Sequence, residues 1–173
     1  GEESFGFMVG DAVRDKDAVA AILLVSEIAA QAKASGSSIY QELMNLYVDF
    51  GFYKESLISI TKKGIEGANE IKQMMVELRE NPLTEINGER VVCIEDYQSS
   101  KGKDFMNADE FEITIPKSNV LIYYLEDGSK ICARPSGTEP KIKFYFSVNA
   151  PLDSVAEAKE VENDLDNKIA NII

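Results

Sequence analysis

Histidine is absent from the 173 residues of this chain, and only two cysteines, Cys93 and Cys132, occur. Without histidine the chain cannot form a Ser-His-Asp triad, a phosphohistidine or a histidine general base, and most zinc sites are excluded. Each cysteine lies in an apolar, strand-forming run, where a buried free thiol is the expected state. This cysteine usage suits a reducing compartment, so we expect a cytoplasmic protein.

Positive charge is also scarce. Lysine and arginine total 18 against 30 aspartate and glutamate residues, which gives a formal net charge of −12. A surface of this charge repels the phosphates of nucleic acid, so we expect no nucleic-acid partner. An anionic ligand would need a local cluster of positive side chains.

Long apolar segments are missing as well. The most apolar run, residues 19–30, is interrupted by Ser26 and Glu27 and is too short to span a bilayer. We therefore expect a buried helix there and no membrane partner. Hydrophobic residues still make up 45% of the chain, which is enough for a core. Because the chain opens at Gly1 without an initiator methionine, we expect further protein upstream.

The first 52 residues predict two helices and no strand. Asp17 is a suitable N-cap for a helix that runs to about Ala34 and ends before Gly36. A second helix is expected to begin near Ser38, which stands three residues before Gln41 as in a capping box. We interpret residues 1–52 as the C-terminal portion of one domain and residues 53–173 as a second domain.

Residues 53–173 predict strands interrupted by two helices. A strong turn signal at residues 126–129 predicts a hairpin, the polar residues 98–109 predict a mobile loop, and Asp153 is expected to cap the last helix. The expected strands are 53–61, 91–97, 120–125, 130–133 and 142–148, and the expected helices are 66–80 and one after 153. The fold class is therefore α+β, with a mostly antiparallel sheet and helices on one face.

The sequence Arg-Pro-Ser-Gly-Thr-Glu-Pro-Lys at residues 134–141 has the chemistry of a phosphate-binding loop. Arg134 offers a planar fork of donors, and Ser136 and Thr138 add hydroxyl groups. Gly137 would let successive backbone N–H groups converge on an anion. Lys141 and Lys143 raise the local potential.

The same residues also fit an ordinary turn between two strands. Glu139 places a negative charge in the loop, so it would have to point away or accept backbone N–H bonds. On composition alone, the turn and the phosphate site remain open alternatives.

Two motifs near the start of the chain carry further polar groups. Glu2 and Ser4, in the sequence Gly-Glu-Glu-Ser-Phe-Gly, suit the hydroxyl groups of a sugar, although an acidic solvated segment is the alternative. Lys16, in the sequence Arg-Asp-Lys-Asp at residues 14–17, either belongs to a charged helix cap or reaches an anionic ligand.

These three motifs together resemble the α-D-phosphohexomutase superfamily, the phosphoglucomutases and phosphomannomutases. The resemblance extends over essentially the whole chain and implies the end of the third domain followed by the TBP-like fourth domain. It implies that Glu2, Ser4 and Lys16 bind the sugar. It also implies that Arg134, Ser136, Gly137 and Thr138 bind the phosphate that is not being transferred, and we add Lys143 for its charge.

The resemblance further implies an enzyme that interconverts hexose 1-phosphate and hexose 6-phosphate through a phosphoserine and a bisphosphorylated sugar. The chain contains no phosphoserine segment and no Asp-rich magnesium loop of the family type, so we expect the catalytic serine and Mg²⁺ in missing N-terminal domains of the same protein. No catalytic residue is assigned to this chain. Phe5 and Gly6 stand where some relatives have histidine, which leaves glucose, mannose and pentose open. A non-catalytic sugar-phosphate-binding module and a pure interaction domain are the alternatives.

Overall fold

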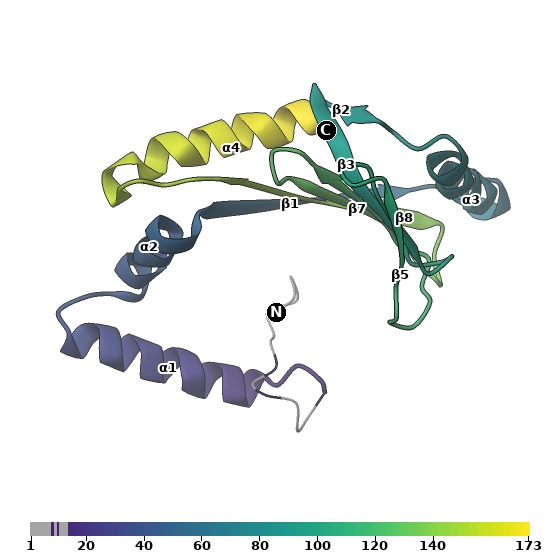
Figure 1. Cartoon of the computed structure of the whole chain (residues 1–173). Helices are drawn as coiled ribbons and strands as arrows, with labels where there is room; N and C mark the ends of the chain where they lie inside the picture. The colour runs from purple at the N-terminus through teal and green to yellow at the C-terminus, as the bar shows by residue number, and fades with distance from the viewer. Residues whose placement is uncertain (1–7, 9, 11–13) are drawn as a thin grey trace.

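The computed structural model describes residues 8, 10 and 14–173 (Figure 1). The elements, in chain order, are α1 Ala18–Ala34, α2 Ile39–Phe50, β1 Phe52–Thr61, α3 Gly64–Glu80, β2 Glu85–Ile86, β3 Glu89–Asp96, β4 Lys101–Asp104, β5 Asp109–Glu112, β6 Leu121–Leu125, β7 Lys130–Pro135, β8 Lys141–Ala150, a short 3₁₀ helix Val155–Glu157 and α4 Ala158–Ile172.

The ends of α1 and α2 follow the expected capping residues. The Asp17 side chain accepts a hydrogen bond from the backbone N–H of Val19, and the Ser38 hydroxyl accepts one from that of Gln41. Gly51 ends α2 with a φ of 94°, a conformation that favours glycine. Local sequence therefore fixes both helices.

The strands form one antiparallel sheet in the order β1-β8-β7-β6-β3-β4-β5, with β2 paired to β3. The central hairpin of β6 and β7 turns at residues 126–129 as expected, where Gly128 has a φ of 82° and Asp127 accepts from the N–H of Ser129. The α+β class and the antiparallel sheet are confirmed.

The expectation of a mobile loop at residues 98–109 is wrong, because β4 and β5 form a second hairpin there. Most residues of this hairpin are polar. One of its cross-strand pairs is different, because Gly102 lies opposite the aromatic Phe111. A Cβ atom on Gly102 would lie 2.1 Å from Phe111 Cζ, so the aromatic ring lies directly across the glycine. Asp104 closes the turn by accepting from the N–H groups of Met106 and Asn107.

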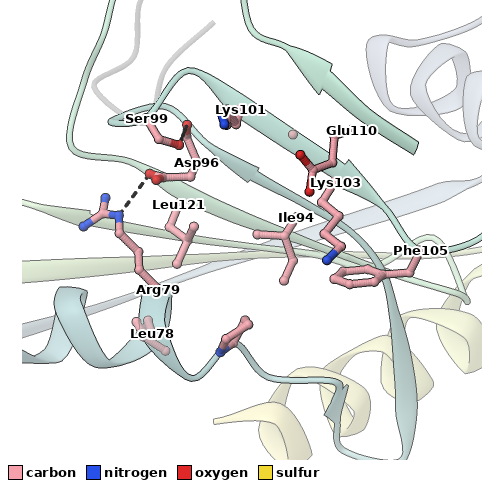
Figure 2. Close-up of a pocket in the computed structure, with 12 residues that line it drawn as sticks. Leu78, Arg79, Ile94, Asp96, Ser99, Lys101, Lys103, Phe105, Glu110 and Leu121 are labelled. Atoms are coloured by element: carbon pink, nitrogen blue, oxygen red, sulfur yellow. Dashed lines mark hydrogen bonds and ion pairs between the residues drawn. The ribbon is translucent and has the colours of Figure 1, made fainter. Parts of the chain in front are cut away.

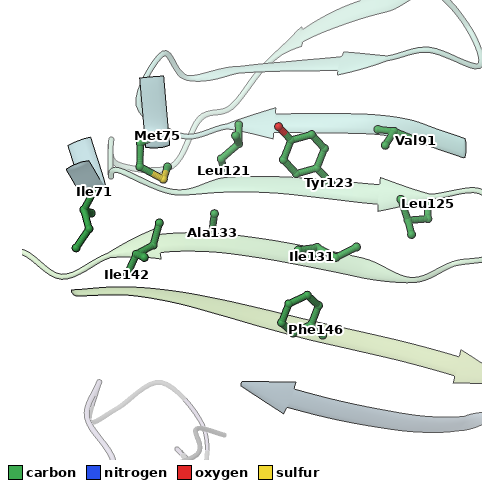
Figure 3. Close-up of a cluster of buried hydrophobic side chains, with 10 residues drawn as sticks. All are labelled: Ile71, Met75, Val91, Leu121, Tyr123, Leu125, Ile131, Ala133, Ile142 and Phe146. Carbon is green, nitrogen blue, oxygen red and sulfur yellow. The ribbon is translucent and has the colours of Figure 1, made fainter. Parts of the chain in front are cut away.

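Both α3 and α4 pack on the same face of the sheet. Figure 3 shows Ile71 and Met75 of α3 above side chains of β3, β6, β7 and β8. Leu165 and Ile169 of α4 join a second buried cluster with Phe52 and Val148. The opposite face carries no helix from residues 53–173, and we call it the open face.

The start of the last helix differs from expectation. Asp153 does not cap α4, which instead follows the 3₁₀ helix Val155–Glu157, and neither helix start has a side-chain cap. The chain is held there by packing, since Leu152 and Ala158 are buried in the cluster with Leu165. Burial of Leu152 and Ala158 therefore fixes the start of α4, in place of the capping hydrogen bond expected from Asp153.

Helix α2 packs its buried Met44 into that same cluster, whereas α1 lies apart from the sheet (Figure 1). Ala32 is the one buried residue of α1, and Ile22 and Leu23 are 69% and 63% exposed. The expected burial of this helix is therefore not found within the described residues. Among those residues no single helix is long and apolar enough to cross a membrane; only α1 and α2 together, at a 90° bend, pass that test of length and composition.

Candidate functional site

The candidate phosphate loop connects β7 to β8 at the middle of the sheet. Its two ends are joined by a hydrogen bond from the Ser136 N–H to the Lys141 carbonyl at 2.8 Å. The Pro140 carbonyl accepts from the N–H of Lys62, also at 2.8 Å, which ties the loop to the chain after β1. These bonds fix the base of the loop and leave its tip, residues 137–139, exposed.

Two cations stand at the base of this loop on the open face. Arg134 of β7 is the register partner of Lys143 of β8, so their side chains project from the same face. Arg134 is exposed, and it forms no ion pair with any residue that the structure describes. Lys143 Nζ lies 5.8 Å from the centroid of the Tyr145 ring, which orients it by a cation–π contact.

A pocket of about 600 Å³ opens beside these cations. Arg134, Lys141 and Lys143 supply three positive side chains, and Glu139 supplies one negative side chain. Within a protein of net charge −12, this is a local excess of positive charge. The remaining lining residues are Pro135, Ser136, Gly137 and Tyr145.

Inside the loop, the N–H groups of Thr138 and Glu139 both point at the Ser136 hydroxyl oxygen, each at 3.4 Å. These long bonds are weak, so an anion could replace the hydroxyl as their acceptor. Gly137 does not adopt a left-handed backbone, and a Cβ atom there would meet nothing within 4 Å. The convergence of N–H groups therefore arises from residues 136–139 and not from a special conformation of Gly137.

Glu139 takes neither of the roles expected for it. Its carboxylate lies 3.8 Å from Lys141 Nζ and is well exposed. This contact is at the outer limit of an ion pair and is weak in water. Both side chains line the pocket, so Lys141 can turn from Glu139 to a more highly charged ligand.

Thr138 faces a different hollow from the other predicted phosphate ligands. It lines a depression on the helix side of the loop, together with Ala68, Lys72 and Asn119. Ser136 and Gly137 line both hollows. The loop therefore brings Arg134, Ser136, Gly137 and Lys143 together at the pocket, while Thr138 is not among the residues that line it.

The predicted sugar-binding residues fall largely outside the described part of the chain. Glu2 and Ser4 lie outside it, so their placement is not described. Lys16 is exposed immediately before α1, where its backbone N–H donates to Asp15 at 2.7 Å. The assignments of Glu2, Ser4 and Lys16 stay predictions.

Two pocket residues were not identified as ligands from the sequence. The sequence indicates Lys141 only as a source of positive potential, and it gives no reason to single out Tyr145. The signal that identifies them is the alternation of β8, because residues 141, 143 and 145 share one face of a strand. The sequence alone did not show that this face is the uncovered one.

The open face beside the pocket is polar and hydrogen-bonded. The hydroxyl groups of Tyr97 and Tyr124 both donate to Glu95 Oε2 at 2.9 Å. Partial burial and the neighbouring Glu95 carboxylate raise the pKa of Tyr124 well above its ordinary value. Both tyrosines are therefore neutral donors at physiological pH, and they hold Glu95 in a fixed orientation.

The described residues do not offer a metal site. No group of three or more carboxylate or thiol side chains is placed to hold an ion within residues 14–173. The pocket instead provides cations, hydroxyl groups and weakly bonded N–H donors. This set of groups suits an oxyanion such as a phosphate monoester.

Comparisons with known proteins agree with this chemistry. Residues 1–47 match the family model for phosphoglucomutase/phosphomannomutase, alpha/beta/alpha domain III. A phosphoglucomutase from Staphylococcus aureus is 41% identical over 157 residues, and one from Staphylococcus epidermidis is 39% identical over the same length. Each alignment covers 90% of this chain but 28% and 29% of the relative, so the chain spans little more than a quarter of their length.

A solved structure supports the fold. The open form of the Paramecium phosphoglucomutase pp63/parafusin superposes with a TM-score of 0.51 at 19% sequence identity. The match covers 96% of this chain and 28% of that structure. The resemblance to the C-terminal part of phosphohexomutases, inferred from the sequence, is confirmed by these comparisons together.

Proposed function

Since the chain belongs to the α-D-phosphohexomutase superfamily, we propose that it supplies substrate recognition to an enzyme that interconverts hexose 1-phosphate and hexose 6-phosphate. The observation that carries this proposal is the pocket at the base of the 134–141 loop, where Arg134 and Lys143 project side by side. In this proposal the pocket holds the phosphate group that is not being transferred.

The chemistry of the pocket fits a substrate that binds in two orientations. In the proposed reaction, a phosphoserine donates its phosphoryl group to the sugar, the bisphosphorylated sugar turns around, and the other phosphoryl group returns to the serine. Arg134 and backbone N–H groups recognise the tetrahedral oxygens of phosphate and not the carbon to which the phosphate is attached. The same pocket therefore accepts the 1-phosphate or the 6-phosphate.

Glu2, Ser4 and Lys16 are proposed to hold the sugar itself. Carboxylate and hydroxyl oxygens accept hydrogen bonds from ring hydroxyl groups, which are similar from either end of a hexose. The serine nucleophile and the Mg²⁺ that the family implies are proposed to lie in other parts of the full-length enzyme, because the described residues do not form a metal site. We also propose a cytoplasmic location, which suits the two free thiols.

A titration of this 173-residue chain with inorganic phosphate and glucose 1-phosphate, followed by two-dimensional NMR, tests the proposal. Both ligands should shift the amide signals of residues 136–139 and 143, and Arg134→Ala should weaken binding about tenfold, as expected for one charge-assisted bidentate contact. The matched control is Lys130→Ala, which removes a cation from the same strand and face without touching the pocket. If Lys130→Ala weakens binding as much as Arg134→Ala does, a specific phosphate site is ruled out.

In the full-length enzyme, Arg134→Ala should raise KM strongly, because it removes a contact to bound substrate. The 173-residue chain by itself should show no mutase turnover. Turnover by the chain alone, or unchanged KM and kcat in the variant, would contradict the assigned role.

A further inference from the structure

Two lysines on the helix side of the sheet lie directly opposite carboxylates. At the hollow between α3 and the β4–β5 hairpin, Lys103 is the register partner of Glu110, and Lys101 is that of Glu112 (Figure 2). Each lysine is therefore matched by an opposite charge on the neighbouring strand. Pairs of this kind stabilise the hairpin without any ligand.

Lys143 on the open face lies between a cation and a neutral side chain of the sheet. Its register partners are Arg134 of β7 and Ser59 of β1. Repulsion between like charges across a strand pair pushes the Lys143 ammonium group away from Arg134. If nothing opposed this repulsion, the flexible lysine side chain would leave the pocket, and a ligand could bring it back only at a cost in side-chain entropy.

Tyr145 contacts Lys143 along strand β8. The two residues are two positions apart, so their side chains lie on the same face of the strand, and both line the phosphate pocket. Lys143 Nζ lies 5.8 Å from the centroid of the Tyr145 ring, which is within the range of a cation–π attraction. This attraction acts along β8, whereas the repulsion from Arg134 acts across the strands.

The Tyr145 ring is itself held in the sheet. Its register partners are Cys132 of β7 and Leu57 of β1, which flank it on the open face. Tyr145 is partly buried, and its hydroxyl group forms no hydrogen bond with any residue in the described part of the chain. Its effect on Lys143 therefore comes from the ring and not from the hydroxyl group.

We propose that Tyr145 is a positioning residue of the phosphate pocket, whose ring holds the Lys143 ammonium group beside Arg134 so that both cations meet one phosphate group. This inference rests on the proposed function of the pocket. A cation–π contact at an exposed site is weaker than a charge-assisted hydrogen bond to phosphate, so the ring orients Lys143 without competing for it. Tyr145 acts on phosphate binding only through Lys143.

The ligand-free chain tests the contact between the two side chains. The ring current of Tyr145 should shift the Hε signal of Lys143 in two-dimensional carbon–proton NMR spectra of the 173-residue chain. Tyr145→Leu should move this signal to the position of an exposed lysine such as Lys130, whereas Tyr145→Phe should leave it in place. A Lys143 signal that does not change in Tyr145→Leu would overturn the inference, whatever the affinity for phosphate.

Titration with inorganic phosphate tests the effect on binding. Tyr145→Leu should weaken binding about three- to fivefold through loss of one cation–π contact, and Tyr145→Phe should bind like the unmodified chain. In a Lys143→Gln background, Tyr145→Leu should cause no further loss, because the group that it positions is gone. Tyr53→Leu, on the open face of β1 and outside the pocket, is the matched control and should change nothing.

The titration also separates this inference from the proposed function. If the unmodified chain does not bind phosphate, the proposed function fails and the inference fails with it. If the chain binds phosphate but Tyr145→Leu costs nothing, or costs the same with and without the Lys143 side chain, only the inference is wrong. In the full-length enzyme, Tyr145→Leu should raise KM with little change in kcat, and an unchanged KM would contradict the positioning role.

Discussion

Arg134 of β7 and Lys143 of β8 are direct register partners, so two like charges face each other across one antiparallel pair. Like charges in this position lower stability, by up to about 1 kcal/mol. In the proposed function, a phosphate group binds between these two cations. This relationship leads to the first prediction.

Arg134→Gln should leave the free energy of unfolding unchanged or raise it by up to about 0.5 kcal/mol, because it removes repulsion from Lys143. The same change should weaken phosphate binding. Urea unfolding and a phosphate titration on the same sample measure the two effects. A loss of more than about 1 kcal/mol of stability would mean that Arg134 has a structural role.

Gly67→Ala should destabilise the protein strongly. Gly67 is buried in α3, and an added Cβ atom would lie 2.5 Å from Lys62 Cβ and 2.9 Å from the Lys62 carbonyl carbon. The backbone would have to move, at a cost of about 1–3 kcal/mol in urea unfolding. Gly137→Ala is the control, since nothing lies within 4 Å of the added atom; equal stability losses in the two variants would contradict this account.

The Arg79–Asp96 pair should make stability depend on pH in the acid range. Partial burial opposes ionisation of Asp96, but hydrogen bonds from Ser99, Arg79 and Gln98 outweigh it and hold its pKa below the ordinary value. A lowered folded-state pKa stabilises the protein above the unfolded pKa of about 3.9, and this stability is lost as pH falls through the folded pKa.

Asp96→Asn should therefore lower the free energy of unfolding by about 2 kcal/mol at pH 7, since it leaves the half-buried Arg79 without its counter-charge. The difference between the variant and the unmodified chain should shrink as pH falls below about 4. Urea unfolding between pH 2.5 and 7 measures it. A difference that stays constant across this range would show that Asp96 does not act through its charge.

Cys93 and Cys132 should react slowly with thiol reagents in the folded protein. Burial raises the pKa of both thiols, and Glu95 and Asp104 raise that of Cys93 further. A raised pKa leaves less thiolate at pH 8, and the thiolate is the reactive form. Reaction rates with a disulfide reagent should rise sharply in denaturing urea. The variants Cys93→Ser and Cys132→Ser show which cysteine gives which reaction rate. A fast reaction at either cysteine in the folded protein would contradict the prediction.

The sequence predicted those elements whose signals are local. Asp17 and Ser38 carry their capping information in the next two or three residues, and the turn around Gly128 is equally local. The β4–β5 hairpin was missed because its signal is the contact between Gly102 and Phe111, which are nine positions apart and surrounded by polar residues. Asp153 resembled a cap, but burial of Leu152 and Ala158 determined where α4 starts.

By itself, the sequence determined the chemical groups of the phosphate loop, because Arg134, Ser136 and Lys143 carry the same donors in any fold. Only the tertiary structure decided which of them act together. Pairing of β7 with β8 sets Arg134 beside Lys143, and packing of α3 and α4 on the other face leaves the side of Tyr145 open. Strand register and helix packing join residues far apart in the chain, and no local pattern of residues contains that information.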